Sequence, residues 1–374
     1  MRYDIAIIGA GPAGLEVGYQ LSKKGFKVII IDRKREIGKP VQCAGLVGQK
    51  VIELVGRGNY IISKVTYAKV FSKSASATIR GIEHAYSIDR ASFDKYMASR
   101  ALNAGSDIML NSAAKDVKNG KVILKSSEIF ADYIIIAEGA ERCISRRLGI
   151  VKSSPIVTGY ELLIKPKNTI EEGVYIVLDS ELFPKFFGWV VPKGDFLLVG
   201  GGGLLSREVI RHSVKFIAKK YGIKGIFGHY SGGIPLRPSL SVSKGNIFCV
   251  GDCAGQVKAT TGGGIYMSIV FARALSEHIE DLHNDFRIDK EYIYRRKNEL
   301  KELIIDYKIW RWYSSLDNLS YDRMVIFLKE NESLFGKVPY DYHSRAIFYS
   351  LFSKKKGLVL KEGAKLILSL FSPF

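Results

Sequence analysis

A glycine-rich segment near the N-terminus has the spacing of a phosphate-binding turn. Residues 9–14 read GAGPAG, in which Gly9 permits a tight turn and Gly11 lets a phosphate approach the backbone. Gly14 allows the following helix to pack closely on the preceding strand, and the start of that helix would offer free N–H groups to a pyrophosphate. Asp32 ends the next apolar stretch, where its carboxylate can accept hydrogen bonds from ribose hydroxyls. The combination predicts a dinucleotide site.

A second glycine-rich segment far along the chain extends this site. Residues 250–265 read VGDCAGQVKATTGGGI, with Asp252 placed to accept hydrogen bonds from sugar hydroxyls. The glycines up to Gly264, followed by Ile265, open a helix whose N–H groups would stabilise negative charge. A plain nicotinamide domain does not need this second element, whereas a flavin does, because its ribityl chain and ring extend past the pyrophosphate. We therefore predict FAD and place Arg33 beside its adenosine half, rather than on a 2′-phosphate.

The composition narrows the class of protein. The chain has 374 residues, 47% of them hydrophobic, and a formal net charge of +19. Its basic residues are scattered and no nucleic-acid-binding signature accompanies them, so we expect no nucleic-acid partner. An anionic membrane or a phosphorylated substrate are the other interpretations of this charge. The cysteines form no CxxC motif and no histidine pair lies near them, so we expect no metal site; they are Cys43, Cys143, Cys249 and Cys253.

No targeting or membrane-spanning segment is recognisable in the sequence. The N-terminus leads directly into a predicted strand, and no apolar run reaches the roughly 18–20 residues that span a bilayer. We expect a cytoplasmic protein, with peripheral attachment to the inner face of the cell membrane as an extension. Residues 345–374 carry six basic residues and one acidic residue. This tail could lie on an anionic membrane surface or dock as a helix on its own domain.

Hydrophobic periodicity predicts the elements that position these segments. Uninterrupted apolar runs predict buried parallel strands; they are Asp4–Ile8, Lys27–Ile31, Asp132–Ala137 and Asn246–Val250. Helices are expected over 14–25 and 92–104, the second with Phe93, Tyr96, Met97 and Leu102 as core candidates. Residues 61–86 alternate as antiparallel strands do. A strand-rich stretch follows from 150 to 241, interrupted by a helix near 207–221.

The interleaving of these patterns predicts an α/β fold, α+β overall. A discontinuous Rossmann-like FAD-binding domain would comprise residues 1–60, 87–149 and 242–283. A mainly antiparallel sheet, the substrate domain, would be inserted as residues 61–86 and 150–241. Residues 284–374 would form a helical C-terminal lobe.

These residues, in this order, resemble the p-hydroxybenzoate hydroxylase-like flavoproteins, and within them the geranylgeranyl reductase family. The resemblance covers about residues 1–279 and includes PVQCAGLV at 40–47, SIDRASFD at 87–94 and AEG at 137–139. It implies that the cysteine loop covers the flavin and that the arginine of the second motif contacts FAD. The implied FAD contacts are Ala13, Asp32, Cys43, Ala44, Leu46, Arg90, Ala114, Asp252, Gly264 and Ile265.

The substrate-side signature of that family, PxxYxWxFP, is only partly matched. This chain reads PKFFGWVVP, which retains Pro184, Trp189 and Pro192 but has Phe187 in place of the tyrosine and Val191 in place of the phenylalanine. The resemblance implies that Phe187, Trp189 and Pro192 bind substrate. The aromatic residues could equally be ordinary core residues.

The resemblance implies an FAD-dependent reductase that saturates C=C bonds of geranylgeranyl chains in isoprenoid ether lipids or prenyl phosphates. Hydride from flavin N5 and a proton would be added, with NAD(P)H or a ferredoxin-like protein as electron donor. Cys43 is the candidate catalytic residue, although it could simply pack against the ring. An FAD-dependent monooxygenase of the same fold and a flavin-containing prenyl-lipid binding protein are the alternatives. A halogenase is disfavoured because residue 187 is Phe and not a second tryptophan.

Overall fold

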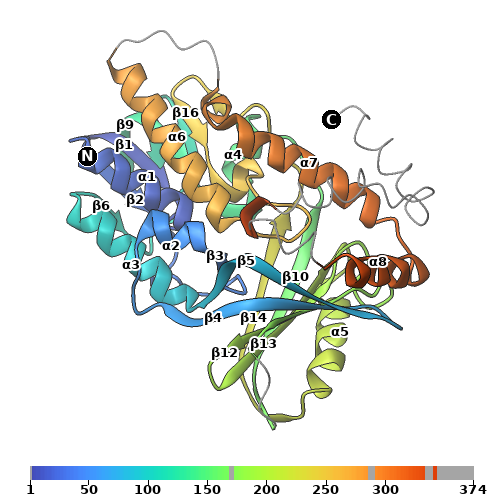
Figure 1. The fold of residues 1–374 in the computed structure, drawn as a ribbon. Coiled ribbons are helices and arrows are strands. Elements are labelled where there is room, and N and C mark those ends of the chain that lie inside the picture. The colour runs from blue at the N-terminus through green and yellow to red at the C-terminus, as the bar shows by residue number, and fades with distance from the viewer. Residues whose placement is uncertain (1, 168–171, 285–290, 333–339, 343–374) are drawn as a thin grey trace.

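A computed structural model describes residues 2–167, 172–284, 291–332 and 340–342 (Figure 1). Its first sheet has the strand order β15-β16-β9-β1-β2-β6, with the β7–β8 hairpin attached to β9. The parallel strands are β1 (Arg2–Ile8), β2 (Val28–Ile31), β6 (Asp107–Met109), β9 (Glu128–Ile136) and β16 (Ile247–Cys249). The antiparallel additions are β7 (Asp116–Lys118), β8 (Lys121–Ile123) and β15 (Ser243–Lys244). The predicted parallel strands are thereby confirmed.

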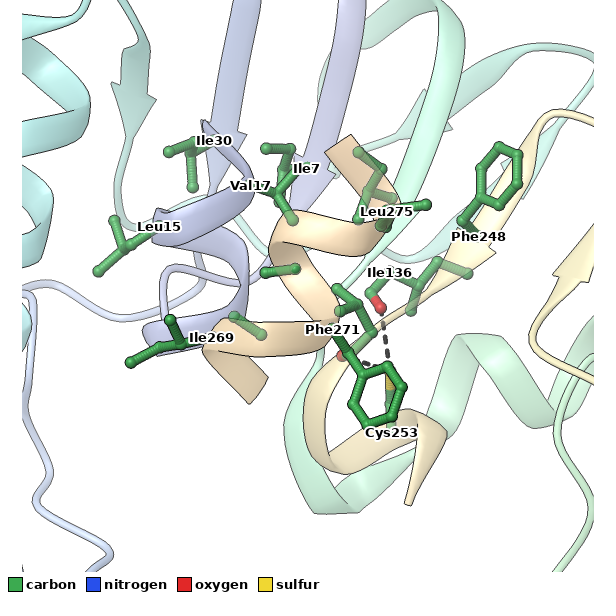
Figure 2. Close-up of a cluster of buried hydrophobic side chains, with 14 of the residues drawn as sticks. Ile7, Leu15, Val17, Ile30, Ile136, Phe248, Cys253, Ile269, Phe271 and Leu275 are labelled. Atoms are coloured by element: carbon green, nitrogen blue, oxygen red, sulfur yellow. Dashed lines mark hydrogen bonds between the residues drawn. The ribbon is translucent and has the colours of Figure 1, made fainter. Parts of the chain in front are cut away.

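Helices cover the apolar strands of this first sheet. Figure 2 shows Ile7 and Ile30 of the sheet beneath Leu15 and Val17 of α1 (Pro12–Lys23). On the same face, Ile269, Phe271 and Leu275 come from α6 (Ile265–His283). Each of these side chains is almost inaccessible, and such burial contributes about 1.5–3 kcal/mol per residue. The stretches Ile5–Ile8, Val28–Ile31 and Ile134–Ile136 are continuous apolar runs because both of their faces are buried.

Helix α3 (Arg90–Asn103) corrects one expectation about the core. It begins at an Asp89 cap, whose side chain accepts a hydrogen bond from the Ser92 backbone N–H. Phe93 and Met97 are buried as expected, but Leu102 is 51% exposed, so its placement in the core was wrong. The buried stripe continues from Met97 to Ala101, four residues on, and Leu102 is turned by about 100° toward solvent.

The second sheet is mainly antiparallel, with the order β14-β10-β13-β12-β11-β4-β5-β3, and its one described parallel pair is β4–β11. Its strands are β3 (Leu46–Gly48), β4 (Ile61–Phe71), β5 (Ser76–Ile88), β10 (Ile156–Pro166), β11 (Val174–Val177), β12 (Gly188–Lys193), β13 (Phe196–Gly203) and β14 (Ile223–Pro235). Helix α5 (Arg207–Lys219) packs on one face, where Ile210 and Val214 meet Tyr160 and Leu162. The intervening residue of β10, Glu161, belongs to the opposite face.

Helices α7 and α8 cover part of that opposite face (Figure 1). Their Trp310 and Val325 share a core with Val70 of β4 and Phe186. The remaining helices are α2 (Gln49–Val55), α4 (Cys143–Arg147), α7 (Lys297–Tyr313), α8 (Asn318–Glu330) and the 3-10 turns η1 (Gly139–Glu141), η2 (Gly251–Ala254), η3 (Tyr292–Arg296) and η4 (Tyr340–Tyr342). The architecture confirms the predicted α/β fold with its inserted antiparallel sheet.

The finer organisation of the chain stays a prediction. The domain boundaries are untested, and β3 pairs with β5 of the second sheet although it lies within residues 1–60. The predicted tail helix at 345–374 lies outside the described residues, as does much of the C-terminal lobe. Within the part of the chain that the structure describes, no helix has the length and hydropathy needed to cross a bilayer.

His278 in α6 should make the fold sensitive to acid. Its ring packs edge-on against Phe248, with centroids 5.7 Å apart, and burial, together with Arg295, lowers its pKa to about 4, against the opposing effect of Asp281. The pKa of a histidine in the unfolded chain is about 6.5. As the pH falls below that value, the unfolded chain therefore binds a proton that the folded chain does not bind. Stability from this residue is therefore complete above about pH 6.5 and lost toward pH 4.

We expect His278→Phe to flatten the loss of stability between pH 7 and 4.5 by up to about 3 kcal/mol, because the buried position no longer titrates. Urea unfolding of the wild type and the variant at several pH values measures this difference. His212→Phe, at an exposed position on α5, is the control and should follow the wild type. Parallel curves for wild type and His278→Phe would contradict the expectation.

Candidate functional site

One cavity of about 1920 Å³ connects the two sheets. Its nucleotide end is formed by the turn after β1 and by the segment after β16, which carry Gly11 and Asp252. Its other end is lined by Trp189 of β12 and by Met324 of α8. The volume exceeds that of ordinary ligand pockets, about 300–1,000 Å³, so a cofactor and a long substrate can share it.

The first glycine turn is built to bring backbone close to a ligand. Gly9 has a φ of +113°, and a Cβ there would lie 2.2 Å from the Ala137 carbonyl oxygen. A Cβ on Gly14 would lie 2.0 Å from the Gly9 carbonyl oxygen, whereas a Cβ on Gly11 would meet nothing within 4 Å. Gly11 caps α1 without any side-chain hydrogen bond. The first N–H groups of α1 are therefore left for an anion.

Asp32 and Arg33 line the cavity beside this turn. The Asp32 carboxylate accepts hydrogen bonds from the backbone N–H groups of Ala10, at 2.7 Å, and Lys34, at 2.8 Å. It therefore orders the loops on both sides while facing the cavity. Arg33 forms an ion pair with Glu141, and this hydrogen bond lowers the pKa of the Glu141 carboxyl.

Asp252 lies in η2, and its carboxylate comes close to Gly264 at the start of α6. Burial raises the pKa of its carboxyl, while Arg142 and Arg90 oppose the shift. Its carboxylate has no hydrogen-bond donor among the described side chains and backbone groups, and its Oδ1 would be 3.0 Å from a Cβ on Gly264. Gly264 caps α6 without a side-chain hydrogen bond, so free N–H groups at Ile265 adjoin an unmatched acceptor. A hydroxyl-bearing chain with an electron-poor ring attached would satisfy both.

Arg142 holds the backbone of Asp252 in place, a role that the sequence analysis did not predict. It is buried in a left-handed conformation with φ of +53°. Its Nε and Nη2 donate to the Asp252 carbonyl oxygen at 3.2 and 3.0 Å, and its Nη1 donates to Ser154 Oγ at 2.6 Å. A single arginine in a turn gives no sequence signal for such a role.

Cys43 faces the cavity between two cationic side chains. Arg90 donates to both oxygens of Asp94, at 2.9 and 3.2 Å. Burial disfavours the Arg90 charge, but Asp94 and Cys43 outweigh it and raise the pKa of Arg90. Burial lowers the pKa of Lys193 to about 8, against the opposing effects of Cys43 and Glu161. Lys193 Nζ donates to the carbonyls of Gly45 and Ile88, which ties β12 to the cysteine loop.

The predicted site residues can now be placed. Those that line the cavity are Gly9, Gly11, Ala13, Asp32, Arg33, Cys43, Ala44, Leu46, Arg90, Ala114, Phe187, Trp189, Asp252, Gly264 and Ile265. Gly14 packs against the turn, and Pro192 lies behind the wall, where its carbonyl accepts a hydrogen bond from Ser87 Oγ at 2.7 Å. Phe187 stacks on Phe186 at 4.4 Å.

Glu161 is the lining residue that sequence reasoning missed most clearly. A signal was present, because Glu161 is the charged residue in the apolar stretch Tyr160–Ile164. Strand alternation directs its side chain to the face of the sheet opposite that of Tyr160 and Leu162. A buried carboxylate is costly unless it is paired or hydrogen-bonded, so a lone one on an apolar strand indicates a hydrogen-bond partner or a functional role.

The described residues fit FAD. The uncapped start of α1 suits a pyrophosphate, Asp32 adjoins it, and the unmatched Asp252 carboxylate and the α6 N-terminus suit the ribityl chain and the ring. The cysteine loop and β12 enclose the remaining space beside the expected ring position.

Comparison with known proteins decides the family. A model described as pyridine nucleotide-disulphide oxidoreductase matches residues 3–206. The digeranylgeranylglycerophospholipid reductase of Methanothrix thermoacetophila is 30% identical over 306 residues, which cover 75% of this chain and 78% of the relative. The chain belongs to the geranylgeranyl reductase family. A second family member, from Methanococcus aeolicus, is 26% identical and covers 88% of both chains. The family identifies an FAD-dependent oxidoreductase.

Solved structures support the fold of this geranylgeranyl reductase family member. A geranylgeranyl bacteriochlorophyll reductase-like protein from Thermoplasma acidophilum has a TM-score of 0.82 at 23% identity, covering 98% of this chain and 99% of the other. An anhydrotetracycline hydroxylase from Streptomyces rimosus reaches 0.67 at 16% identity, covering 94% and 76%. Both likenesses concern the architecture.

Proposed function

We propose that this protein is an FAD-dependent reductase that saturates C=C bonds of geranylgeranyl chains in isoprenoid ether lipids or prenyl phosphates. The observation that carries the proposal is the continuity of one cavity from the glycine turns to an apolar arm. The named activity of the Methanothrix relative agrees with it.

The apolar arm has the lining that a prenyl chain requires. It extends past Trp189 between the second sheet and the helices α7 and α8. The apolar side chains that line this arm include Ala68, Ile79, Ile176, Leu178, Phe187, Ile309, Leu316, Met324, Phe327 and Leu328. An unbranched polar substrate would leave these side chains without matching groups, whereas a branched hydrocarbon chain buries them.

Each part of the site has a role in such a reduction. Bound FAD, once reduced, supplies hydride at N5. The N–H groups that open α6 lie where they would stabilise negative charge on the ring's pyrimidine edge. The faces of Phe187 and Trp189 would stabilise cationic character at the alkene by about 0.5–2 kcal/mol each. The apolar arm would keep water from the reacting carbons.

We propose Cys43 as a catalytic residue, with Arg90 and Lys193 beside it. The proposal also includes the electron donor, which is NAD(P)H or a small ferredoxin-like protein. It further includes a cytoplasmic location and contact of the tail, residues 345–374, with an anionic membrane. The basic net charge of +19 would steer an acidic electron carrier toward the protein.

A single-turnover experiment tests the proposal. FAD-loaded protein is photoreduced without oxygen and mixed with a digeranylgeranyl glycerophospholipid in detergent. We expect the oxidised flavin spectrum to return and the lipid to gain two hydrogens per reduced double bond. A flavin that stays reduced until oxygen enters would overturn the proposal: oxygenated lipid would then identify a monooxygenase, and unchanged lipid a binding protein.

A further inference from the structure

We propose that Glu161 is the acid of this site and delivers the proton that accompanies hydride addition to the alkene. The inference rests on the proposed reductase function and assigns the proton donor that the reaction requires. Glu161 lines the cavity next to Trp189, at the junction between the predicted ring position and the apolar arm.

The backbone fixes which way Glu161 points. Its neighbours Tyr160 and Leu162 pack against α5 on the outer face of the second sheet. Strand alternation therefore directs Glu161 into the cavity, where only 5% of its surface is exposed.

A cross-strand contact holds the carboxyl in place. Trp189 Nε1 donates to Glu161 Oε1 at 2.9 Å, across β13, where both residues pair with Gly200. A Cβ on Gly200 would lie 2.3 Å from Trp189 Nε1. Glycine at this position therefore leaves room for the indole to reach Glu161. Because Oε1 accepts from Trp189, the proton of the neutral carboxyl belongs on Oε2, which has no partner among the described residues.

The surrounding charges keep this carboxyl near its point of titration. Burial raises the pKa of Glu161 to about 7, opposed by the Trp189 hydrogen bond, Lys193 and Arg90. Tyr230, the cross-strand neighbour on β14, is itself raised in pKa by burial and by Glu161, and so remains neutral. Asp89 and Cys43, like Glu161, oppose the lowering of the Lys193 pKa. A group poised near neutrality suits general acid catalysis.

Other carboxylates of the cavity are already engaged, with two exceptions, Glu83 and Asp252, of which Asp252 lies beside the start of α6, where the ribityl chain is expected. Asp94 is paired with Arg90, Glu141 with Arg33, and Glu138 accepts the backbone N–H groups of Ile144 and Ser145. Glu83, on β5, also lines the cavity and has a buried Oε2 without a partner. It provides the comparison residue for the experiment.

The step balances as an addition of two hydrogens. Glu161 Oε2 would give its proton to one alkene carbon as the π bond breaks and would be left as a carboxylate. Reduced FAD, when bound, would supply the hydride for the other C–H bond, so that the alkene is reduced by the two electrons that FAD gives up. Solvent protons restore the acid before the next turnover.

The test compares Glu161→Gln with Glu83→Gln in the single-turnover assay with digeranylgeranyl glycerophospholipid. We expect Glu161→Gln to slow flavin reoxidation by the lipid by about 100-fold or more, with FAD content and reoxidation by oxygen unchanged. Glu83→Gln should stay within about threefold of the wild type, and Glu161→Asp should recover part of the rate. The wild-type rate should fall as pH rises through about 7.

Trp189→Phe separates positioning from proton transfer. Loss of the indole N–H removes a hydrogen bond that favours the carboxylate, so the midpoint of the pH profile should move upward. Independently of turnover, the protein without FAD should show a tryptophan fluorescence titration near pH 7 that is absent from both Glu161→Gln and Trp189→Phe.

The outcomes distinguish the two proposals. A wild-type protein that the lipid reoxidises, together with a Glu161→Gln variant equally fast, overturns the role of Glu161 and leaves the reductase function standing. The same holds if Glu83→Gln is the variant that loses the rate. A wild-type protein that the lipid does not reoxidise overturns the reductase function and the role of Glu161 with it.

Discussion

Gly14→Ala should lower the affinity for FAD by about 100-fold or more and lower the free energy of unfolding by roughly 1–3 kcal/mol. The added Cβ would lie 2.0 Å from the Gly9 carbonyl oxygen and 3.1 Å from the Ile7 side chain. Either α1 or the turn after β1 must move, and the uncapped N–H groups of α1 would leave the pyrophosphate position. Fluorescence titration with FAD and urea unfolding of the FAD-free protein measure the two effects.

Gly11→Ala is the matched control for that variant. A Cβ on Gly11 meets nothing within 4 Å, so unfolding of the FAD-free protein should change by less than about 1 kcal/mol. The methyl group would, however, enter the cavity at the start of α1 and lower FAD affinity by about 10-fold. If Gly14→Ala bound FAD as the wild type does, the cofactor site would have to lie elsewhere.

Met324→Asp should lower kcat/KM for the prenyl lipid by about 100-fold or more while leaving FAD binding intact. Met324 lines the apolar arm from α8, and a carboxylate there would have to lose its water against a hydrocarbon chain. The cost falls on substrate binding, because the nucleotide end is formed by other elements. Steady-state kinetics with the lipid and FAD titration measure the two effects separately.

Ile326→Asp tests whether a charge on α8 is harmful in itself. Ile326 is two residues away on the same helix, is 42% exposed and does not line the cavity. This variant should keep kcat/KM within about twofold of the wild type, since surface substitutions usually change stability by less than about 0.5 kcal/mol. Equal losses in both variants would indicate that α8 had unfolded and would not support the arm as the prenyl site.

The nucleotide half of the fold was predictable because its signals are local. The turn at Gly9 and the apolar strand that ends at Asp32 each follow from a few neighbouring residues. The core of α3 shows the limit of such reasoning: Phe93 and Met97 follow the helical period, but Leu102 fits an apolar pattern and still faces solvent. Which stripe of a helix is buried depends on its neighbours in space.

The substrate half depends on pairings that the sequence does not show. Glu161 and Trp189 are separated by 28 positions and meet only because β13 lies between their strands. Arg142 reaches Asp252 across 110 positions through a turn of unusual backbone conformation. Both contacts depend on strand register and side-chain direction, and neither contact corresponds to a motif in the sequence.

The two longest strands of the second sheet, β5 and β14, extend through thirteen residues each and pair along most of their length with β4 and β10, with register shifts in both ladders. A scaffold braced in this way cannot widen without breaking many backbone hydrogen bonds at once. On the proposed function, we therefore expect selectivity among isoprenoids of different length to depend on the helical wall, α7 and α8. Chimeras that exchange this wall between relatives should inherit the donor's preference and keep the recipient's redox behaviour.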